Sequence, residues 1–145
     1  MFKTILIPTD GSALSENAAK KSLQLAKSLN AKAVGFYSIE PFHILAANTE
    51  MMSDTREVYE RDSKLRASSS LAKIEDFARS AGVACECVSG QDDSPWQGII
   101  KAAQSKGCDL IAMASHGRTG MQGILIGSQA NHVLTHSKIP VLIFR

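Results

Sequence analysis

No apolar run in the 145-residue chain approaches the roughly eighteen residues needed to span a bilayer. The opening residues, MFKTILIPTDGS, also lack the charged, then apolar, then small pattern of a secretory signal, so we expect a cytoplasmic protein without a membrane partner. The 16 Lys and Arg nearly balance the 14 Asp and Glu and are scattered along the chain. A basic stripe for nucleic acid is absent, and a nucleic-acid partner is not expected.

The chain has only three cysteines, an odd number: Cys85, Cys87 and Cys108. The first two are spaced to lie on one face of a strand. A C-x-C pair without a second ligand pair matches no zinc or redox signature. We therefore interpret all three thiols as core residues.

Several familiar motifs are missing as well. The chain has no G-x-x-x-x-G-K-[ST], and the glycines at 117, 120 and 123 are spaced G-x-x-G-x-x-G rather than G-x-G-x-x-G. A G-x-S-x-G nucleophile elbow is absent. A phosphate-accepting receiver would need paired acids after the first strand and an Asp ending the third, where the sequence has Asp10 alone and Ser89. These absences exclude ordinary P-loop, dinucleotide, hydrolase and receiver sites.

What is present is a regular alternation of strand and helix patterns. Short apolar runs predict five strands, at residues 4–8, 33–39, 83–89, 108–115 and 139–145. Helical periodicity predicts helices between 12 and 30, over 54–81, between 94 and 107, and over 127–136. Residues 41–54 are irregular and are predicted to form a long loop.

This order predicts one domain, residues 1–145, in the α/β class. Strands that alternate with helices form a doubly wound five-stranded parallel sheet with helices on both faces, a Rossmann-like arrangement. Ligands of such sheets lie outside the carboxyl ends of the strands, where the strand order reverses. The first strand runs into PTDGS and the fourth into a glycine-rich loop, so both segments are expected at that edge.

Two helix starts carry capping signals. Ser12 is placed to cap the first helix, and Asn30 to end it. Ser94 is placed to cap the third helix, with Pro95 in its first turn and Gln97 positioned to reach back to the cap amide.

Four residues at the predicted edge suggest anion or nucleotide chemistry, and each has an ordinary alternative. Gly127 and Ser128 open a helix, where free amides and the helix dipole bind phosphate, but Gly-Ser is also a common cap. Asp10 suits a ribose hydroxyl or an exocyclic amine, or else only a turn before the first helix. Arg118 suits a terminal phosphate, or else solvent.

His116 is not assigned a catalytic role, because no titrating partner is identifiable beside it. No catalytic residue and no metal ligand is predicted anywhere in the chain.

With ILIPTDGS at the start and MASHGRTGMQGILIGSQANHVLTHSKIPVLIFR at the end, the chain resembles the universal stress protein family over essentially its whole length. ATP-binding members carry G-x2-G-x9-G-[ST] after the fourth strand. Gly117, nine further residues and then Gly127-Ser128 match this pattern, while Ala114 occupies the first glycine position. If that position needs a positive φ, the methyl group costs on the order of 1 kcal/mol; in a strand conformation it costs nothing.

The resemblance implies a stress-related adenine-nucleotide-binding protein with a fold like that of the adenine nucleotide alpha hydrolases. The nucleotide would be ATP, ADP or AMP, with Mg²⁺ accompanying it and no dedicated carboxylate ligand. It also implies a homodimer through the last strand, which an apolar edge such as PVLIFR favours. The implied binding residues are Pro8, Thr9, Asp10, Ser38, Met113, Ala114, Ser115, His116, Gly117, Arg118, Gly127, Ser128 and Gln129.

Three functions remain open at this point. The first is a nucleotide-binding regulatory module, and the second is a slow ATPase or nucleotidyl transferase using the same pocket. The third is a dimeric stress protein that binds no nucleotide and acts through protein contacts.

Overall fold

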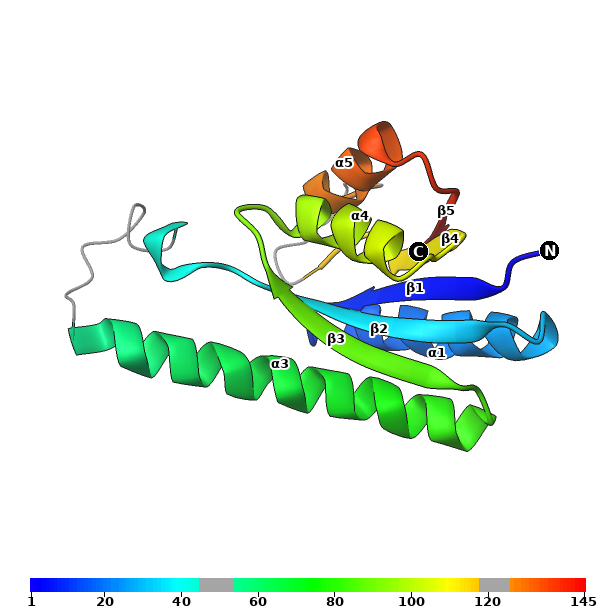
Figure 1. The fold of residues 1–145 in the computed structure, drawn as a ribbon, viewed down its shortest axis with the longest axis horizontal. Helices are drawn as coiled ribbons and strands as arrows, with labels where there is room; N and C mark the ends of the chain where they lie inside the picture. Colours follow the sequence, from blue (N-terminus) through cyan, green and yellow to red (C-terminus); the bar gives the residue numbers. More distant parts are fainter. Residues whose placement is uncertain (45–53, 118–125) are drawn as a thin grey trace.

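The computed structural model describes residues 1–44, 54–117 and 126–145. Its elements follow in the order β1 (Thr4–Thr9), α1 (Ala13–Ser28), β2 (Lys32–Ile39), α3 (Asp54–Ala81), β3 (Cys85–Gln91), α4 (Pro95–Ser105), β4 (Leu110–Ala114), α5 (Ser128–His136) and β5 (Val141–Phe144). All strand pairs are parallel, and the sheet order is β3-β2-β1-β4-β5. The predicted five-stranded parallel sheet is confirmed (Figure 1).

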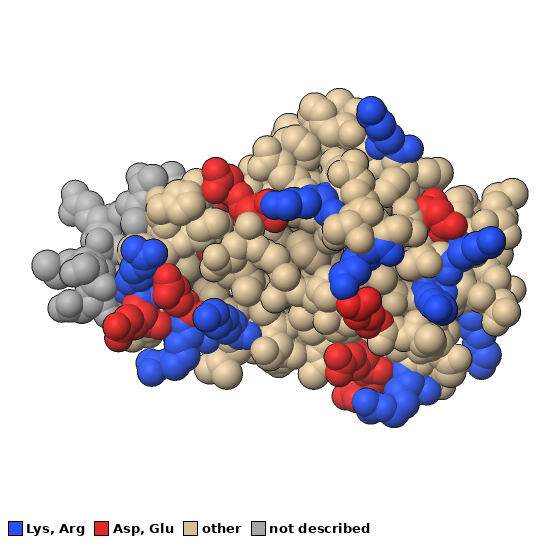
Figure 2. Space-filling view, in the orientation of Figure 1, with Lys and Arg blue, Asp and Glu red and all other residues tan. Residues whose placement is uncertain are grey.

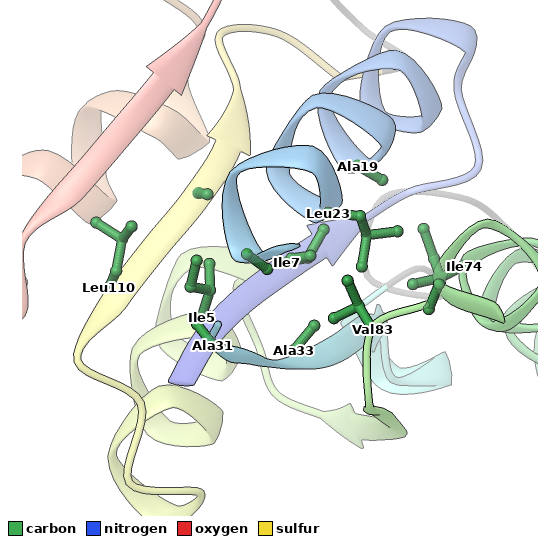
Figure 3. Packing of buried hydrophobic residues seen from close by; sticks show 12 residues of the cluster. Ile5, Ile7, Ala19, Leu23, Ala31, Ala33, Ile74, Val83 and Leu110 are labelled. Atoms are coloured by element: carbon green, nitrogen blue, oxygen red, sulfur yellow. The ribbon is translucent and has the colours of Figure 1, made fainter. Parts of the chain in front are cut away.

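Two helices cover each face of the sheet. Figure 1 shows α1 and α3 on one side and α4 and α5 on the other. Successive residues of β1 serve both layers: Ile5 and Ile7 pack with the α1/α3 layer, whereas Leu6 packs with the α4/α5 layer. In the first layer Leu23 and Ile74 meet the sheet and are essentially inaccessible to solvent (Figure 3). Because β1 is a parallel strand that is buried on both faces, its sequence is continuously apolar.

Helix boundaries follow the sequence signals closely. The range of α3 is the predicted one. The Ser12 side chain accepts a hydrogen bond from the Ser15 amide at 3.2 Å, as a helix cap does. Just after α1, Asn30 has a φ of 53°, and its amide bonds to the Lys27 carbonyl. The capping predictions for α1 are therefore confirmed.

Strand boundaries agree less well. The third strand starts two residues later than predicted, because the Val83 amide still bonds back to the Ala78 carbonyl at the end of α3. The last two strands are shorter than predicted at both ends. In the predicted loop, residues 42–44 are helical, and 45–53 lie outside the described residues.

Charged side chains of both signs are interspersed on the face drawn in Figure 2. No stripe of Lys and Arg is visible on that face. Among the helices of the described residues, none combines the length and the apolar character needed to cross a membrane.

The Asp109 side chain, just before β4, binds the start of β1 at the amino-terminal edge of the sheet. Its carboxylate accepts hydrogen bonds from the Lys3 amide at 2.9 and 3.1 Å and from the Thr4 amide at 3.0 Å. Burial alone would raise the pKa of Asp109, but the bonds from the Thr4 and Lys3 amides, together with its own amide and the charged amino terminus, outweigh burial and hold the pKa below its ordinary value.

Replacing Asp109 by Asn is expected to lower the free energy of unfolding by about 1 kcal/mol at pH 7, since the ionised acceptor is lost. A depressed pKa means that this stability is present above the ordinary pKa of an aspartate, about 3.9, and disappears as the pH falls through the folded-state value. Urea unfolding of both proteins at pH 7 and pH 3 measures the difference, which should shrink in acid. Asp76→Asn, at an exposed ion pair with Arg79, is the matched control and should change stability by less than about 0.5 kcal/mol.

Candidate functional site

The strand order reverses between β1 and β4. β1 pairs with β2 on one side and with β4 on the other, in the register Ile5 with Leu110. The chain leaves β1 toward α1, which lies on one face, and returns through β4 toward α5 on the other face. The carboxyl ends of these two strands therefore lie at the switch point of the sheet, the place where open parallel sheets bind ligands.

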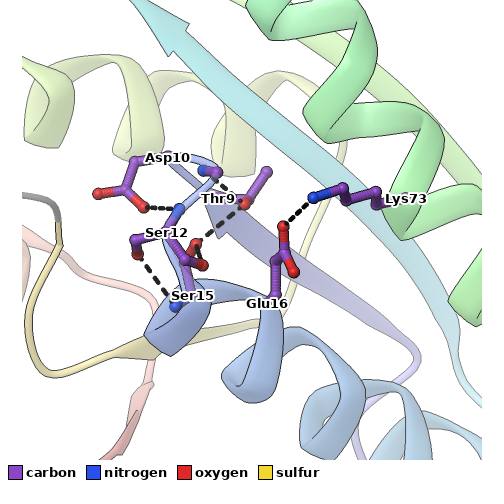
Figure 4. Close-up of polar contacts among 7 residues, drawn as sticks. Thr9, Asp10, Ser12, Ser15, Glu16 and Lys73 are labelled. Carbon is purple, nitrogen blue, oxygen red and sulfur yellow. Dashed lines mark hydrogen bonds and ion pairs between the residues drawn. The ribbon is translucent and has the colours of Figure 1, made fainter.

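A network of short polar side chains shapes the turn after β1 (Figure 4). Thr9 Oγ1 lies 3.1 Å from Ser15 Oγ, and both side chains are buried. The Gly11 amide donates to Thr9 Oγ1 at 3.2 Å. The Ser12 amide donates to Asp10 Oδ1 at 3.0 Å. The turn is thus held rigid by side chains from both its ends.

Asp10 therefore fulfils its ordinary alternative role, because one carboxylate oxygen stabilises the turn before α1. Its other oxygen faces the loop after β4. A Cβ built on Gly117 would lie only 2.3 Å from Asp10 Oδ2. The two predicted segments do meet at the sheet edge, and glycine at position 117 permits the contact.

Gly127 docks the start of α5 against the loop after β4. Its amide donates to the Ser115 carbonyl at 2.7 Å. A Cβ on Gly127 would lie 3.1 Å from that carbonyl oxygen and 3.5 Å from His116 Cα. The expectation that the Gly127 amide is available to a phosphate is therefore wrong, because an internal acceptor already uses it.

The next amides of α5 differ from that of Gly127. Gly127 is the N-cap, so the first intrahelical bond is that of the Asn131 amide to the Gly127 carbonyl. The amides of Ser128 and Gln129 meet no acceptor among the described residues. Unpaired amides at the positive end of a helix dipole attract an anion.

The side chain of Gln129 has an internal role. Its Oε1 accepts a hydrogen bond from the Trp96 amide at 3.0 Å, in the first turn of α4. The Ser94 side chain makes no capping bond. The predicted start of α4 is confirmed, with Ser94 at the N-cap and Pro95 in the first turn, but the predicted capping bond is wrong, because an acceptor from α5 replaces the Ser94 side chain. Gln129 can offer a ligand its backbone amide, but its side-chain oxygen is engaged.

Ala114 is the last residue of β4, pairs with Phe144 of β5, and is 6% exposed. Its backbone is extended rather than left-handed. Of the two possibilities left open by the sequence, the strand conformation is the one observed. The methyl group at this motif position therefore causes no backbone strain.

Two buried polar atoms near the edge lack partners in the part of the chain that the structure describes. They are Ser38 Oγ, at the end of β2, and His116 Nε2, after β4. The other nitrogen of His116, Nδ1, lies 3.1 Å from Ser115 Oγ. Because buried polar atoms are normally hydrogen-bonded, two unpartnered ones at one sheet edge are consistent with a bound polar molecule.

Comparison with known proteins agrees with this geometry. The family model described as the universal stress protein family matches residues 1–145. The chain belongs to the universal stress protein family. It is 33% identical over 151 residues to the universal stress protein MJ0531 of Methanocaldococcus jannaschii, an alignment that covers all of this chain and 83% of that protein.

Solved structures of universal stress proteins share the fold. The structure of MJ0577, also from Methanocaldococcus jannaschii, superposes with a TM-score of 0.82 at 27% identity, covering 99% of this chain and 95% of that one. A universal stress protein in complex with cAMP superposes with a TM-score of 0.75 at 24% identity, covering 99% and 97% of the two chains.

In this universal stress protein, the remaining predicted site residues fall into two groups. Pro8, Thr9 and Met113 are buried within their strands. Arg118 lies outside the described residues, together with the glycines at 120 and 123. Reasoning from sequence placed the two segments at one edge but did not identify the close approach of Asp10 to Gly117. The shared edge of the two strands was its only available signal.

Proposed function

We propose that this protein binds an adenine nucleotide, in the first instance ATP, at the carboxyl edge of β1 and β4, and acts as a cytoplasmic stress-response regulator. One observation carries the proposal: the Gly127 amide fixes the start of α5 against the loop after β4, and the amides of Ser128 and Gln129 beside it have no acceptor among the described residues. This is the arrangement in which a helix start binds phosphate. The unpartnered Ser38 Oγ and His116 Nε2 add polar groups at the same edge.

Each part of the edge would take one part of the nucleotide. Asp10 would accept from a ribose hydroxyl or the adenine amine, with Pro8 and Thr9 beside it, and the backbone near Ser38 would border the base. The loop after β4 would follow the ribose and phosphates through Met113, Ala114, Ser115, His116 and Gly117. The phosphates would lie at Ser128 and Gln129, with Arg118 at the terminal one.

Mg²⁺ would reach such a site with the nucleotide. Among the described residues, no three His, Cys, Asp or Glu side chains are grouped to hold a metal ion. The phosphates themselves would therefore be its main ligands, as is usual for this cation.

The relative solved with cAMP supports the proposal by its shared fold. The argument for this chain depends on its own residues, since at 24% identity the likeness concerns the fold. The chain has glycine at positions 117 and 127, where an added Cβ would crowd Asp10 and the Ser115 carbonyl.

We also propose a homodimer formed through β5. This strand lies at the edge of the sheet, and all four of its residues are only partly buried. An apolar edge strand offers unpaired backbone groups to a second copy. Sedimentation of the wild-type protein should give twice the chain mass of 15.6 kDa.

Titration calorimetry tests the nucleotide proposal directly. Saturable binding of ATP, ADP or AMP at one site per chain is the expected result, and mass spectrometry of the purified protein should detect the nucleotide carried from the cell. No heat with any of the three, from protein shown to be free of nucleotide, would instead favour the dimeric protein that acts through protein contacts. Turnover of ATP that disappears in Asp10→Ala would favour the slow ATPase.

A further inference from the structure

Cys85 and Cys87 form a close thiol pair on β3. They are two residues apart on an edge strand and therefore point to the same face of the sheet. Their sulfur atoms lie 4.0 Å apart. Both residues are free thiols and both are partly exposed, whereas Cys108 is buried. The expectation of core thiols is correct for Cys108 and only partly so for this pair.

The surroundings fix the inner sulfur in place. Cys87 Sγ occupies the space left by the missing side chain of Gly35, where a built Cβ would lie 2.8 Å away. It also lies 3.7 Å from the Leu71 carbonyl oxygen of α3. Ile74 packs against the same gap, since its Cγ2 lies 3.0 Å from the same built Cβ. The pair is therefore partly preorganised and lies against an apolar layer.

A disulfide fits this pair poorly. Two residues along a parallel strand separate the Cα atoms by about 6.6 Å. This is near the upper limit of about 6.8 Å for disulfides, whose usual Cα separation is shorter. The sulfurs would also have to approach from 4.0 Å to bonding distance. Strand geometry therefore favours a bridging ion between the two sulfur atoms over a disulfide bond.

The sulfur separation suits a bridging metal ion. With metal–sulfur bonds of about 2.3 Å, two thiolates on one ion lie about 3.8 Å apart at a tetrahedral angle and about 4.6 Å apart when linear. The observed 4.0 Å falls inside this interval. Among the described residues, no third His, Cys, Asp or Glu completes a metal-binding group, which argues against a four-coordinate structural zinc site.

We propose that Cys85 and Cys87 form a binding site for a soft cation of low coordination number, represented by Cu(I). Thiolate ligands select such ions. Binding replaces two thiol protons by one cation, so the bound pair carries one negative charge and the affinity rises with pH. The apolar side chains of α3 limit access of water to the ion.

Competition with a coloured Cu(I) chelator, bathocuproine disulfonate, tests the site in reduced protein under anaerobic conditions. We expect the wild-type protein to withdraw one Cu(I) per chain, and native mass spectrometry to show the added copper. Cys85→Ala and Cys87→Ala should each lower the affinity at least about tenfold, or 1.4 kcal/mol. Cys108→Ala is the matched control, because Cys108 is buried in the α4/α5 layer, whereas Cys85 and Cys87 pack against the α1/α3 layer.

A second measurement does not require variants. Cu(I) should protect Cys85 and Cys87 of the wild-type protein from alkylation by iodoacetamide, as read from peptide masses, even if a variant fails to fold. The proposal is overturned if the wild-type protein withdraws no copper, if alkylation of the pair is unaffected, or if folded variants of the pair bind Cu(I) as tightly as Cys108→Ala does.

Discussion

Gly127→Val is expected to weaken ATP binding at least about thirtyfold, roughly 2 kcal/mol, in a protein that still folds. A Cβ at this position already lies 3.1 Å from the Ser115 carbonyl oxygen and 3.5 Å from His116 Cα. The branched valine side chain would push the start of α5 away from the loop after β4. The bond of the Gly127 amide to Ser115 would then be lost, and the Ser128 amide would move with the helix. Titration calorimetry measures the affinity and thermal unfolding verifies the fold.

Two milder variants make the test specific to the backbone. Gly127→Ala adds only the Cβ, and a shift of a few tenths of an ångström relieves the 3.1 Å contact, so a smaller loss is expected. Ser128→Ala removes the hydroxyl and keeps the amide, so the affinity should fall only a few-fold. If folded Gly127→Val binds ATP as the wild-type protein does, the helix start is not the phosphate site. If Ser128→Ala has the larger effect, the hydroxyl rather than the backbone makes the main contact.

Gly35→Val is expected to lower the free energy of unfolding by about 2–3 kcal/mol, because it overfills the layer between the sheet and α3. Gly35 lies in β2 at a point where a Cβ would be 2.8 Å from Cys87 Sγ and 3.0 Å from Ile74 Cγ2. To relieve these contacts, the side chains of Cys87 and Ile74 must shift, or β3 and α3 must move. Urea unfolding at constant pH measures the change, and an unchanged midpoint would contradict the packing described for this layer.

The same position allows a double-mutant cycle. Gly35→Ala in a Cys87→Ala background removes the closer of the two contacts, so alanine at position 35 should be less destabilising there than in the wild-type protein. Gly107→Ala is the matched control. Gly107 has a φ of +64° and no atom within 4 Å of a built Cβ. Gly107→Ala should therefore lower the free energy of unfolding by about 1–2 kcal/mol through backbone strain alone. The Cys87→Ala background should leave that loss unchanged.

Local signals were sufficient to predict most of the fold. The range of α3 follows from the periodicity of its apolar residues and from Gly82 just after it, which has a φ of +71°. The start of α1 follows from Ser12, whose partner Ser15 is three residues away. Such signals act over one helical turn. The parallel sheet followed in turn from the alternation of strands and helices.

Contacts between distant segments could not be predicted in this way. The Trp96 amide donates to the side chain of Gln129, 33 residues later in the chain, and the Ser94 side chain makes no capping bond. The Gly127 amide donates to the carbonyl of Ser115, twelve residues earlier in the chain, and the spacing of the glycines does not reveal this contact. The spacing of Cys85 and Cys87 indicated a shared face, but their environment depends on Gly35 in the neighbouring strand.

Trp96, whose amide bonds to Gln129 of α5, is an intrinsic fluorescent probe of that helix. Trp96 is the only tryptophan of the chain, and its ring stacks on His132 and His136 of α5, with ring centroids 5.4 and 4.6 Å apart. All of the indole emission therefore originates beside one helix, whose first turn is the proposed phosphate site. A displacement of that helix changes the surroundings of the indole, so fluorescence can follow it without an attached dye.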